Sequence, residues 1–212
     1  KSGISNGIRP AKTDYDLLIL DGSLIDGSGV PARQTDVGIR DGRIVAIGSL
    51  KNETARQTIN AKNHVVSPGF IDLHSHADRG ILQHRAAENY IHQGVTTLLC
   101  GNCGSSPTDV GKFFESVREA GVGPNVAMLI GHGSVRSRIM GTVNAAPTPE
   151  QLVQMRESVK LAMQDGAIGL STSIRYGPGT YADTEEIVAL TKEIAPFRGF
   201  YATHMRDEGT RI

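Results

Sequence analysis

The chain has 212 residues, of which 39% are hydrophobic and 21% are charged, and its 22 basic and 22 acidic side chains cancel at neutral pH. This length can bury a sizeable core, and the composition is that of an ordinary globular protein. Zero net charge argues against nucleic acid or an anionic membrane as the main partner, because both attract a basic surplus. The sequence has no apolar run near the roughly 20 residues that span a bilayer.

Residues 1–13 are polar and predict an unstructured lead-in. Short segments rich in β-formers follow from residue 14 onward. Asp-Gly pairs interrupt these segments at residues 21–22, 26–27 and 41–42. Because Asp-Gly between alternating apolar residues is a strong hairpin signal, we expect residues 14–66 to form a small antiparallel β-domain.

After Pro68, apolar strands alternate with amphipathic helices. The expected strands are "GFIDLH", "VTTLLCG", "NVAMLIG", "AIGLSTS" and "GFYATHM". The expected helices are "RAAENYIHQG", "VGKFFESVREAG", "TPEQLVQMRESVKLAMQDG", with Thr148 as N-cap, and "DTEEIVALTKEIAP". This alternation predicts an α/β fold, either an open doubly wound sheet or a (β/α)8 barrel. A complete barrel takes about 250 residues, so residues 67–212, with five strands, predict a partial one.

His74 and His76 lie two residues apart in "IDLHSH", at the end of the first of these strands. Side chains alternate faces along a strand, so both imidazoles are expected to point the same way. Sites assemble at the carboxyl ends of parallel strands, and histidine is the commonest metal ligand. The pair therefore predicts a divalent-metal site, in which Asp72 or Asp78 orients an imidazole. Two solvent-facing loop histidines are the alternative.

Cys100 and Cys103 follow the second strand in "LLCGNCGSSP". A Cys-x-x-Cys pair suggests redox chemistry, but a redox motif opens a helix directly, whereas Gly, Ser and Pro follow here. A four-cysteine zinc ribbon needs a second pair, and the sequence has only these two cysteines. Cys103 is thus a candidate thiolate ligand beside the histidines, and Cys100, inside the apolar run, is a candidate buried thiol.

Further polar residues follow the later strands. His204 ends the fifth strand and is another candidate metal ligand. His132 and Arg136, in "GHGSVR" after the third strand, are candidate substrate-binding residues, and an ordinary turn residue is the alternative for His132. The Gly- and Pro-rich loop "STSIRYGPGTYAD" adds three candidates of the same kind, Arg175, Tyr176 and Tyr181. Arg175 offers a fork for a carboxylate, with a solvated loop arginine as the alternative.

Seven segments, in order, resemble the amidohydrolase superfamily and, within it, the D-aminoacylase (N-acyl-D-amino-acid deacylase) branch. They are "LILDGSLIDGSG", "VGIRDGRIVAIG", "VSPGFIDLHSHAD", "GVTTLLCGNCG", "GHGSVR", "GAIGLSTSIRYGPGTYADTEE" and "YATHMRDE". The resemblance implies a β-sandwich-like domain beside a (β/α)8 barrel. It also implies hydrolysis of the amide bond of an N-acyl-D-amino acid, with one or two zinc ions as cofactor. The implied metal ligands are His74, His76, Cys103 and His204, with Cys103 in the bridging place that a carboxylated Lys holds in hydantoinase-like relatives.

The resemblance further implies a His and a catalytic Asp after later strands. We expect that Asp to lie beyond Ile212, and residues 1–212 alone to be inactive and to bind zinc weakly. The alternative functions are a cyclic amidase of the dihydroorotase or hydantoinase kind, a non-catalytic remnant of the amidohydrolase fold, and a redox Cys-x-x-Cys protein. The expected partner is a small-molecule substrate, with no nucleic acid and no membrane, and the expected location is the cytoplasm.

Overall fold

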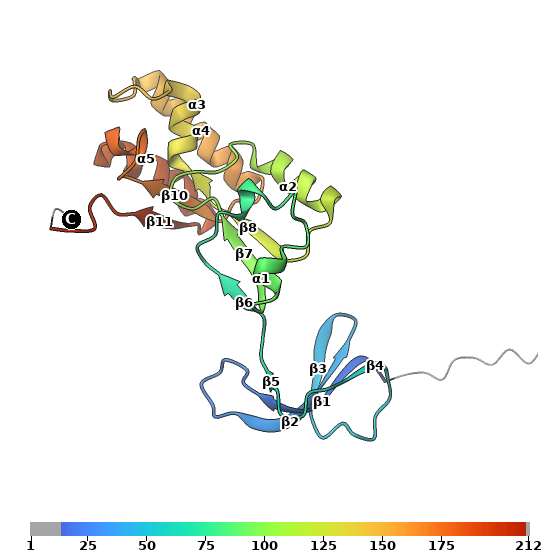
Figure 1. The fold of residues 1–212 in the computed structure, drawn as a ribbon. Coiled ribbons are helices and arrows are strands. Elements are labelled where there is room, and N and C mark those ends of the chain that lie inside the picture. Colours follow the sequence, from blue (N-terminus) through green and yellow to red (C-terminus); the bar gives the residue numbers. More distant parts are fainter. Residues whose placement is uncertain (1–13, 211–212) are drawn as a thin grey trace, which may run out of the picture. The chain divides into compact units, whose positions relative to one another are not determined.

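The computed structural model describes residues 14–210 and divides the chain into two compact units, one up to Pro68 and one from Gly69 onward (Figure 1). The first unit ends at Pro68, and the β-domain predicted from the sequence ended at residue 66. The predicted lead-in at residues 1–13 lies outside the described residues. Within those residues, every helix is too short or too polar to cross a membrane.

The first unit is one five-stranded sheet. Its strands are β1 (Tyr15–Leu24), β2 (Arg33–Arg40), β3 (Arg43–Gly48), β4 (Ala55–Asn60) and β5 (Val65–Val66). β1, β2 and β3 pair antiparallel, and Asp41 and Gly42 turn between β2 and β3 with φ of 51° and 70°, as a tight hairpin requires. β4 and β5 pair with β1 in parallel. The sheet predicted to be antiparallel is therefore mixed.

The Asp21-Gly22 pair does not end a strand. β1 continues through it, and the β1–β2 register shifts there as a bulge. The buried Asp36 carboxylate accepts hydrogen bonds from the backbone N–H groups of Asp21 and Leu50, both at 2.8 Å. This carboxylate stabilises a bulge where the sequence predicted a hairpin.

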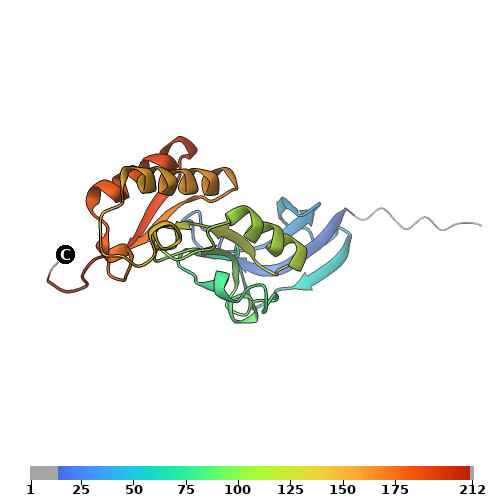
Figure 2. The ribbon, with the colours of Figure 1, turned by 90° about the horizontal axis from the view of Figure 1, so that it is seen from above.

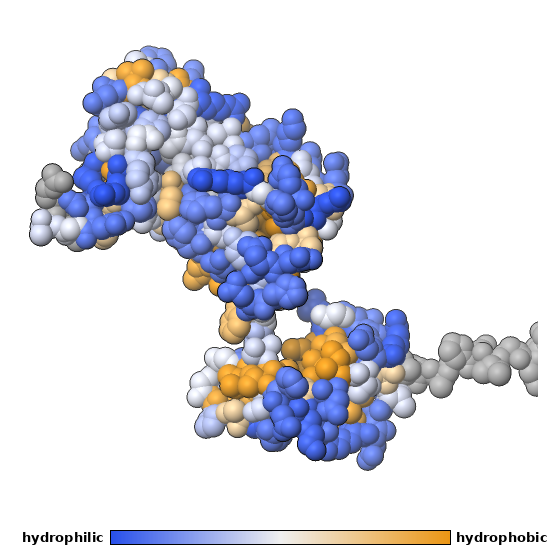
Figure 3. Space-filling view, viewed as in Figure 1, coloured by the Kyte–Doolittle hydropathy of each residue, from blue (hydrophilic) through white to orange (hydrophobic). Residues whose placement is uncertain are grey.

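Apolar side chains remain on the surface of the first unit. Ile44, Val45 and Ile47 of β3 are 64%, 51% and 47% exposed, and Figure 3 shows apolar surface on this unit. The unit thus has a small buried core, which includes Leu18 and Val37, and apolar side chains in contact with solvent.

The second unit contains the five predicted strands. They are β6 (Phe70–Asp72), β7 (Val95–Cys100), β8 (Asn125–Met128) continued by β9 (Ile130–Gly131), β10 (Gly169–Ser173) and β11 (Phe200–His204). Every pairing among them is parallel, with β8 beside β7 and β9 beside β10. Leu129 separates β8 from β9, and its N–H donates to the carbonyl of Cys100. The order β6, β7, β8/β9, β10, β11 is that of a partial (β/α)8 barrel.

Five α-helices accompany these strands. They are α1 (Glu88–Ile91), α2 (Val110–Ala120), α3 (His132–Met140), α4 (Pro149–Gln164) and α5 (Thr184–Ile194), with short 3-10 helices at Ala77–Arg79, Gly179–Tyr181 and Ala195–Phe197. α4 begins as predicted, with a capping box between Thr148 and Gln151. α1 is shorter than the predicted helix because Ala87, at φ 49°, has a left-handed conformation that no helix continues through.

One apolar core lies between helices and strands in the second unit. Met155 of α4, Leu170 of β10 and Leu190 of α5 are fully buried in it. Figures 1 and 2 show α4 and α5 side by side next to β10. Each such side chain stabilises the fold by about 1.5–3 kcal/mol on burial, so the strand ends rest on a rigid base.

Candidate metal centre

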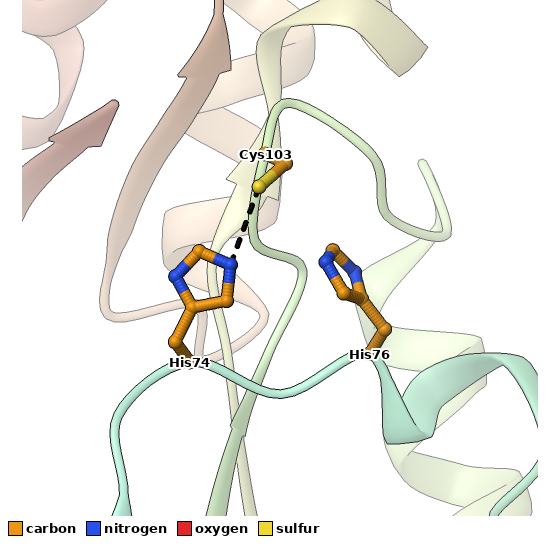
Figure 4. A group of neighbouring side chains, drawn as sticks. All are labelled: His74, His76 and Cys103. Carbon is orange, nitrogen blue, oxygen red and sulfur yellow. Dashed lines mark hydrogen bonds between the residues drawn. The ribbon is translucent and has the colours of Figure 1, made fainter. Parts of the chain in front are cut away.

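Three donor side chains meet at the carboxyl ends of β6 and β7. They are His74, His76 and Cys103, and one ligand atom from each lies within 4.8 Å of the others. Cys103 Sγ is 3.3 Å from His74 Nε2, and Figure 4 shows the two imidazole rings next to the sulfur. The structure thus brings together three of the four predicted ligands.

The turn after β6 sets the direction of the two imidazoles. Ser75 lies between them and is 2% exposed, and its N–H donates to the carbonyl of Leu99 at 3.0 Å. With Ser75 turned into the unit, His74 and His76 turn outward on the same side. Asp72 accepts a hydrogen bond from the backbone N–H of His74 at 3.0 Å, so it holds the turn and not an imidazole.

Cys103 lies in a tight turn with unusual backbone angles. Its φ is 53°, between Gly101 at 75° and Gly104 at 69°. A Cβ on Gly101 would lie 2.0 Å from the carbonyl oxygen of Leu129, so only glycine fits there. A left-handed cysteine is uncommon, and such conformations cluster at functional sites.

Buried hydrogen bonds hold this turn in place. Asn102 donates its side-chain amide to the carbonyl of Leu99 at 2.9 Å. Ser171 of β10 donates its hydroxyl to the carbonyl of Gly101 at 2.5 Å and accepts from the N–H of Gly104 at 3.0 Å. The turn that carries the thiol is therefore tied to two strands.

His204 lies at the edge of the cluster. Its Nδ1 is 3.8 Å from Cys103 Sγ, and its Nε2 is 2.8 Å from an Oε of Glu208. The ring of Tyr176 packs edge-on against it, with centroids 5.2 Å apart. If Nε2 carries the proton toward Glu208, Nδ1 is left as a lone-pair donor on the sulfur side, which is the arrangement of a ligating histidine with a carboxylate partner.

The chemistry of the donor set fits zinc. Burial, with the Arg79 charge acting in the same direction, lowers the pKa of His76, which favours the neutral ligand form. His76 Nδ1 is buried without a hydrogen-bond partner among residues 14–210. Two imidazoles and a thiol are donors that zinc prefers. Burial raises the pKa of Cys103, so metal binding would release its proton.

Cys100 is a core residue. It is fully buried, and burial raises the pKa of its thiol to about 11. A thiol of that pKa is protonated at neutral pH and is a poor nucleophile. This confirms the prediction of a buried thiol and weakens the redox interpretation of the pair.

The donor cluster lines an open cleft of about 940 Å³. His204 and Tyr176 also line it, as does the loop segment from Gly177 to Gly179. Of the other loop candidates, Arg175 is exposed and Tyr181 is 37% exposed, and neither side chain lines this cleft.

His132 and Arg136 occupy a different place from the one predicted. "GHGSVR" forms the start of α3 and not a loop, and the spacing of four residues places both side chains on one helix face. Both are fully buried against Glu186 of α5, with His132 Nε2 2.7 Å from one carboxylate oxygen and Arg136 bonded to the other. They bind this carboxylate, because a buried charge needs a counter-charge, and are not free for a substrate.

The Glu186 carboxylate remains charged in this surrounding. Burial alone would raise its pKa, but the hydrogen bonds from His132 and Arg136 outweigh burial and hold the pKa below its ordinary value. Arg136 also donates to the carbonyl of Ala145 at 2.5 Å. The Glu186 cluster (His132, Arg136 and Glu186) therefore joins α3 to α5 behind the cleft.

Arg79 and Ser173 are among the residues that line the cleft without having been predicted from the sequence. Arg79 follows His76 by three residues in the 3-10 helix Ala77–Arg79, and Ser173 ends β10 in register with His204. Arg79 had a usable signal, since it lies only three residues after the histidine pair. Ser173 had a weaker signal: it lies two residues after Ser171 on the same strand, so the two side chains point to the same face.

Nitrogen and sulfur donors at the carboxyl edge of parallel β/α units define a candidate metal enzyme of the barrel class. Residues 57–205 match the amidohydrolase family. With the relatives described next, this match shows that the chain belongs to that family, in the branch of the D-aminoacylases and N-acyl-D-amino-acid deacylases.

The chain is 38% identical to the D-aminoacylase of Alcaligenes xylosoxydans xylosoxydans over an alignment 221 positions long, which covers 93% of this chain and 46% of that protein. The N-acyl-D-glutamate deacylase from Bordetella bronchiseptica, solved with zinc and a phosphonate inhibitor that mimics the tetrahedral intermediate, superposes with a TM-score of 0.89 at 34% identity. That match covers 92% of this chain and 46% of the other. A D-aminoacylase structure that addresses the role of its binuclear metal centre superposes at 0.86 and 36% identity, over 92% of this chain and 46% of that one. The chain thus spans about half the length of these relatives.

Proposed function

We propose that the full-length protein that carries this chain hydrolyses the amide bond of N-acyl-D-amino acids, with zinc as its metal. The products are a carboxylate and a free D-amino acid. The observation that carries the proposal is the cluster of His74, His76 and Cys103 in a chain 38% identical to a D-aminoacylase. Small N-acylated amino acids are the expected partners, and a cytoplasmic location stays a prediction.

In this proposal the donor atoms of His74, His76 and Cys103 hold the metal, and His204 adds a fourth donor from β11. Zinc bound there would supply Lewis acidity, which would lower the pKa of bound water toward about 7 and polarise the amide carbonyl. One or two ions fit this donor set, since the D-aminoacylase neighbour has a binuclear centre.

The residues around the donor set hold its ligands in place. Glu208 fixes the tautomer of His204, and Tyr176 limits the movement of that ring through its edge-on contact. The left-handed turn at Cys103 keeps the sulfur at the base of the cleft. In this proposal, the proton is carried to the leaving amine by the catalytic Asp that the resemblance implies.

Purified full-length protein, loaded with zinc, tests the proposal on N-acetyl-D-amino acids and their L-enantiomers. We expect free amino acid to be released from the D-substrates only, and expect Cys103→Ser to abolish the release. Cys100→Ser, which changes a core thiol, serves as the matched control and should keep most activity. Opening of a hydantoin without any deacylation would contradict the proposal and favour the cyclic amidase.

A further inference from the structure

The cleft beside the donor cluster has an uneven charge. Among the described residues that line it, Arg79 is the one arginine or lysine, and no aspartate or glutamate is present. Serine residues make up much of the remaining polar lining, including Ser105, Ser134 and Ser137. A cleft of this composition favours an anion over a cation, because it offers a positive charge and hydrogen-bond donors without a competing carboxylate.

The Arg79 guanidinium is free to take a ligand. It has no hydrogen-bond or ion-pair partner within residues 14–210, whereas the buried Arg136 is bonded to Glu186 and to a backbone carbonyl. Arg79 lines the same cleft as His76 and Cys103. Arg79 is therefore near the reacting groups and unpaired.

Ser173 gives a second, independent sign of a missing partner. Its side chain is 5% exposed and lines the cleft, yet its Oγ has no hydrogen-bond partner among the described residues. Leaving a buried hydroxyl unpaired costs about 1–3 kcal/mol. A polar group of a bound molecule can supply the missing bond.

We propose that Arg79 binds a carboxylate of the substrate and that Ser173 donates a further hydrogen bond to the substrate from β10. The planar guanidinium fork matches a carboxylate with two parallel hydrogen bonds. Arg79 takes the carboxylate-binding role that the sequence had suggested for Arg175, because Arg175 lies outside the cleft and the other candidate arginine, Arg136, is paired in the core. This inference rests on the proposed function and names the group that the site recognises.

The carboxylate has two possible sources in an N-acyl-D-amino acid, the α-carboxylate and an acidic side chain. N-acetyl-D-glutamate and N-acetyl-D-glutamine separate them, because they differ only in the charge of the side chain. With full-length protein, we expect Arg79→Gln to raise KM by about tenfold or more, with a smaller change in kcat, and expect Arg79→Lys to restore part of the loss. A rise in KM for both substrates identifies the α-carboxylate as the group that Arg79 binds. A rise in KM for N-acetyl-D-glutamate alone identifies the side-chain carboxylate.

Arg175→Gln is the matched control, because Arg175 is an exposed arginine that does not line the cleft. The KM of this variant should stay within twofold of that of the unmodified protein. Two results would overturn the inference. One is an Arg79→Gln variant whose KM values stay within twofold for both substrates. The other is an equal fall of kcat on both substrates together with lost zinc, which would place Arg79 in the support of the metal centre.

A binding measurement separates failure of this inference from failure of the proposed function. If the unmodified protein deacylates none of the substrates, the proposed function fails, and calorimetric titration with glutarate still tests Arg79. Binding by the unmodified protein that is weakened about tenfold in Arg79→Gln supports the inference. Absent binding, or equal binding by the two proteins, overturns it.

Discussion

Removing the charge of Glu186 should be among the most damaging conservative changes in the chain. Glu186→Gln keeps the size of the side chain but leaves Arg136, which is fully buried, without its counter-charge. Losing one partner of a buried ion pair costs about 3–5 kcal/mol. With a urea slope of about 2 kcal/mol/M, the unfolding midpoint should fall by about 1.5–2.5 M.

Urea unfolding followed by far-UV circular dichroism measures this shift. The matched control is Glu193→Gln, because the Arg156–Glu193 pair joins α4 to α5 with the same chemistry but with Arg156 49% exposed. An exposed pair contributes about 1 kcal/mol or less, so the control midpoint should move by under about 0.5 M. Equal shifts in the two variants would refute the role of burial.

The same variant predicts a pH dependence. The pKa of Glu186 is below its ordinary value of 4.5, so its stabilising contribution is complete above that value and is lost as pH falls through the folded pKa. The stability difference between the unmodified protein and Glu186→Gln should therefore stay constant from pH 7 to 5 and shrink below pH 4.5. A difference that grows on acidification would contradict the assigned direction.

Three further changes test the metal centre and the core. Cys103→Ser should reduce bound zinc, measured by plasma mass spectrometry after dialysis against a chelator, while Cys100→Ser should leave it unchanged. Thr148→Ala removes the capping box of α4 and should lower stability by about 1 kcal/mol in urea unfolding, and no loss would contradict the cap. Leu170→Ala should cost about 2–5 kcal/mol through a core cavity, whereas the 49% exposed Leu161 should tolerate alanine within about 1 kcal/mol.

The sequence predicted the parts of the fold that local signals determine. The five parallel strands and α2, α4 and α5 carry clear periodicity, and α4 begins at its predicted cap. Asp21-Gly22 misled the prediction because Asp36, fifteen residues away, converts a turn signal into a bulge. The four-residue α1 shows the same limit, since the left-handed Ala87 has no marker in its sequence.

The site divides in the same way. His74, His76 and Cys103 follow strand ends, and strand direction alone places such residues at one edge. His132 and Arg136 also follow a strand end, yet both are bonded to Glu186 and do not line the cleft. Glu186 lies 54 residues after His132 and 50 residues after Arg136. Periodicity and spacing carry no information on which carboxylate a distant helix brings to a buried charge.

The anchoring of the cleft has a consequence for altering its selectivity. Hydrogen bonds from Asn102 and Ser171 secure the turn that carries the sulfur, whereas the Glu186 cluster secures α3 behind the wall that Gly133 and Ser134 supply. The two halves are also bonded to each other, because the N–H of Ser134 donates to the carbonyl of Gly104 at 3.1 Å. Reshaping the wall at Ser134 would therefore disturb the turn that carries the sulfur, and an engineer who wants to change selectivity does better to alter a wall residue outside this contact.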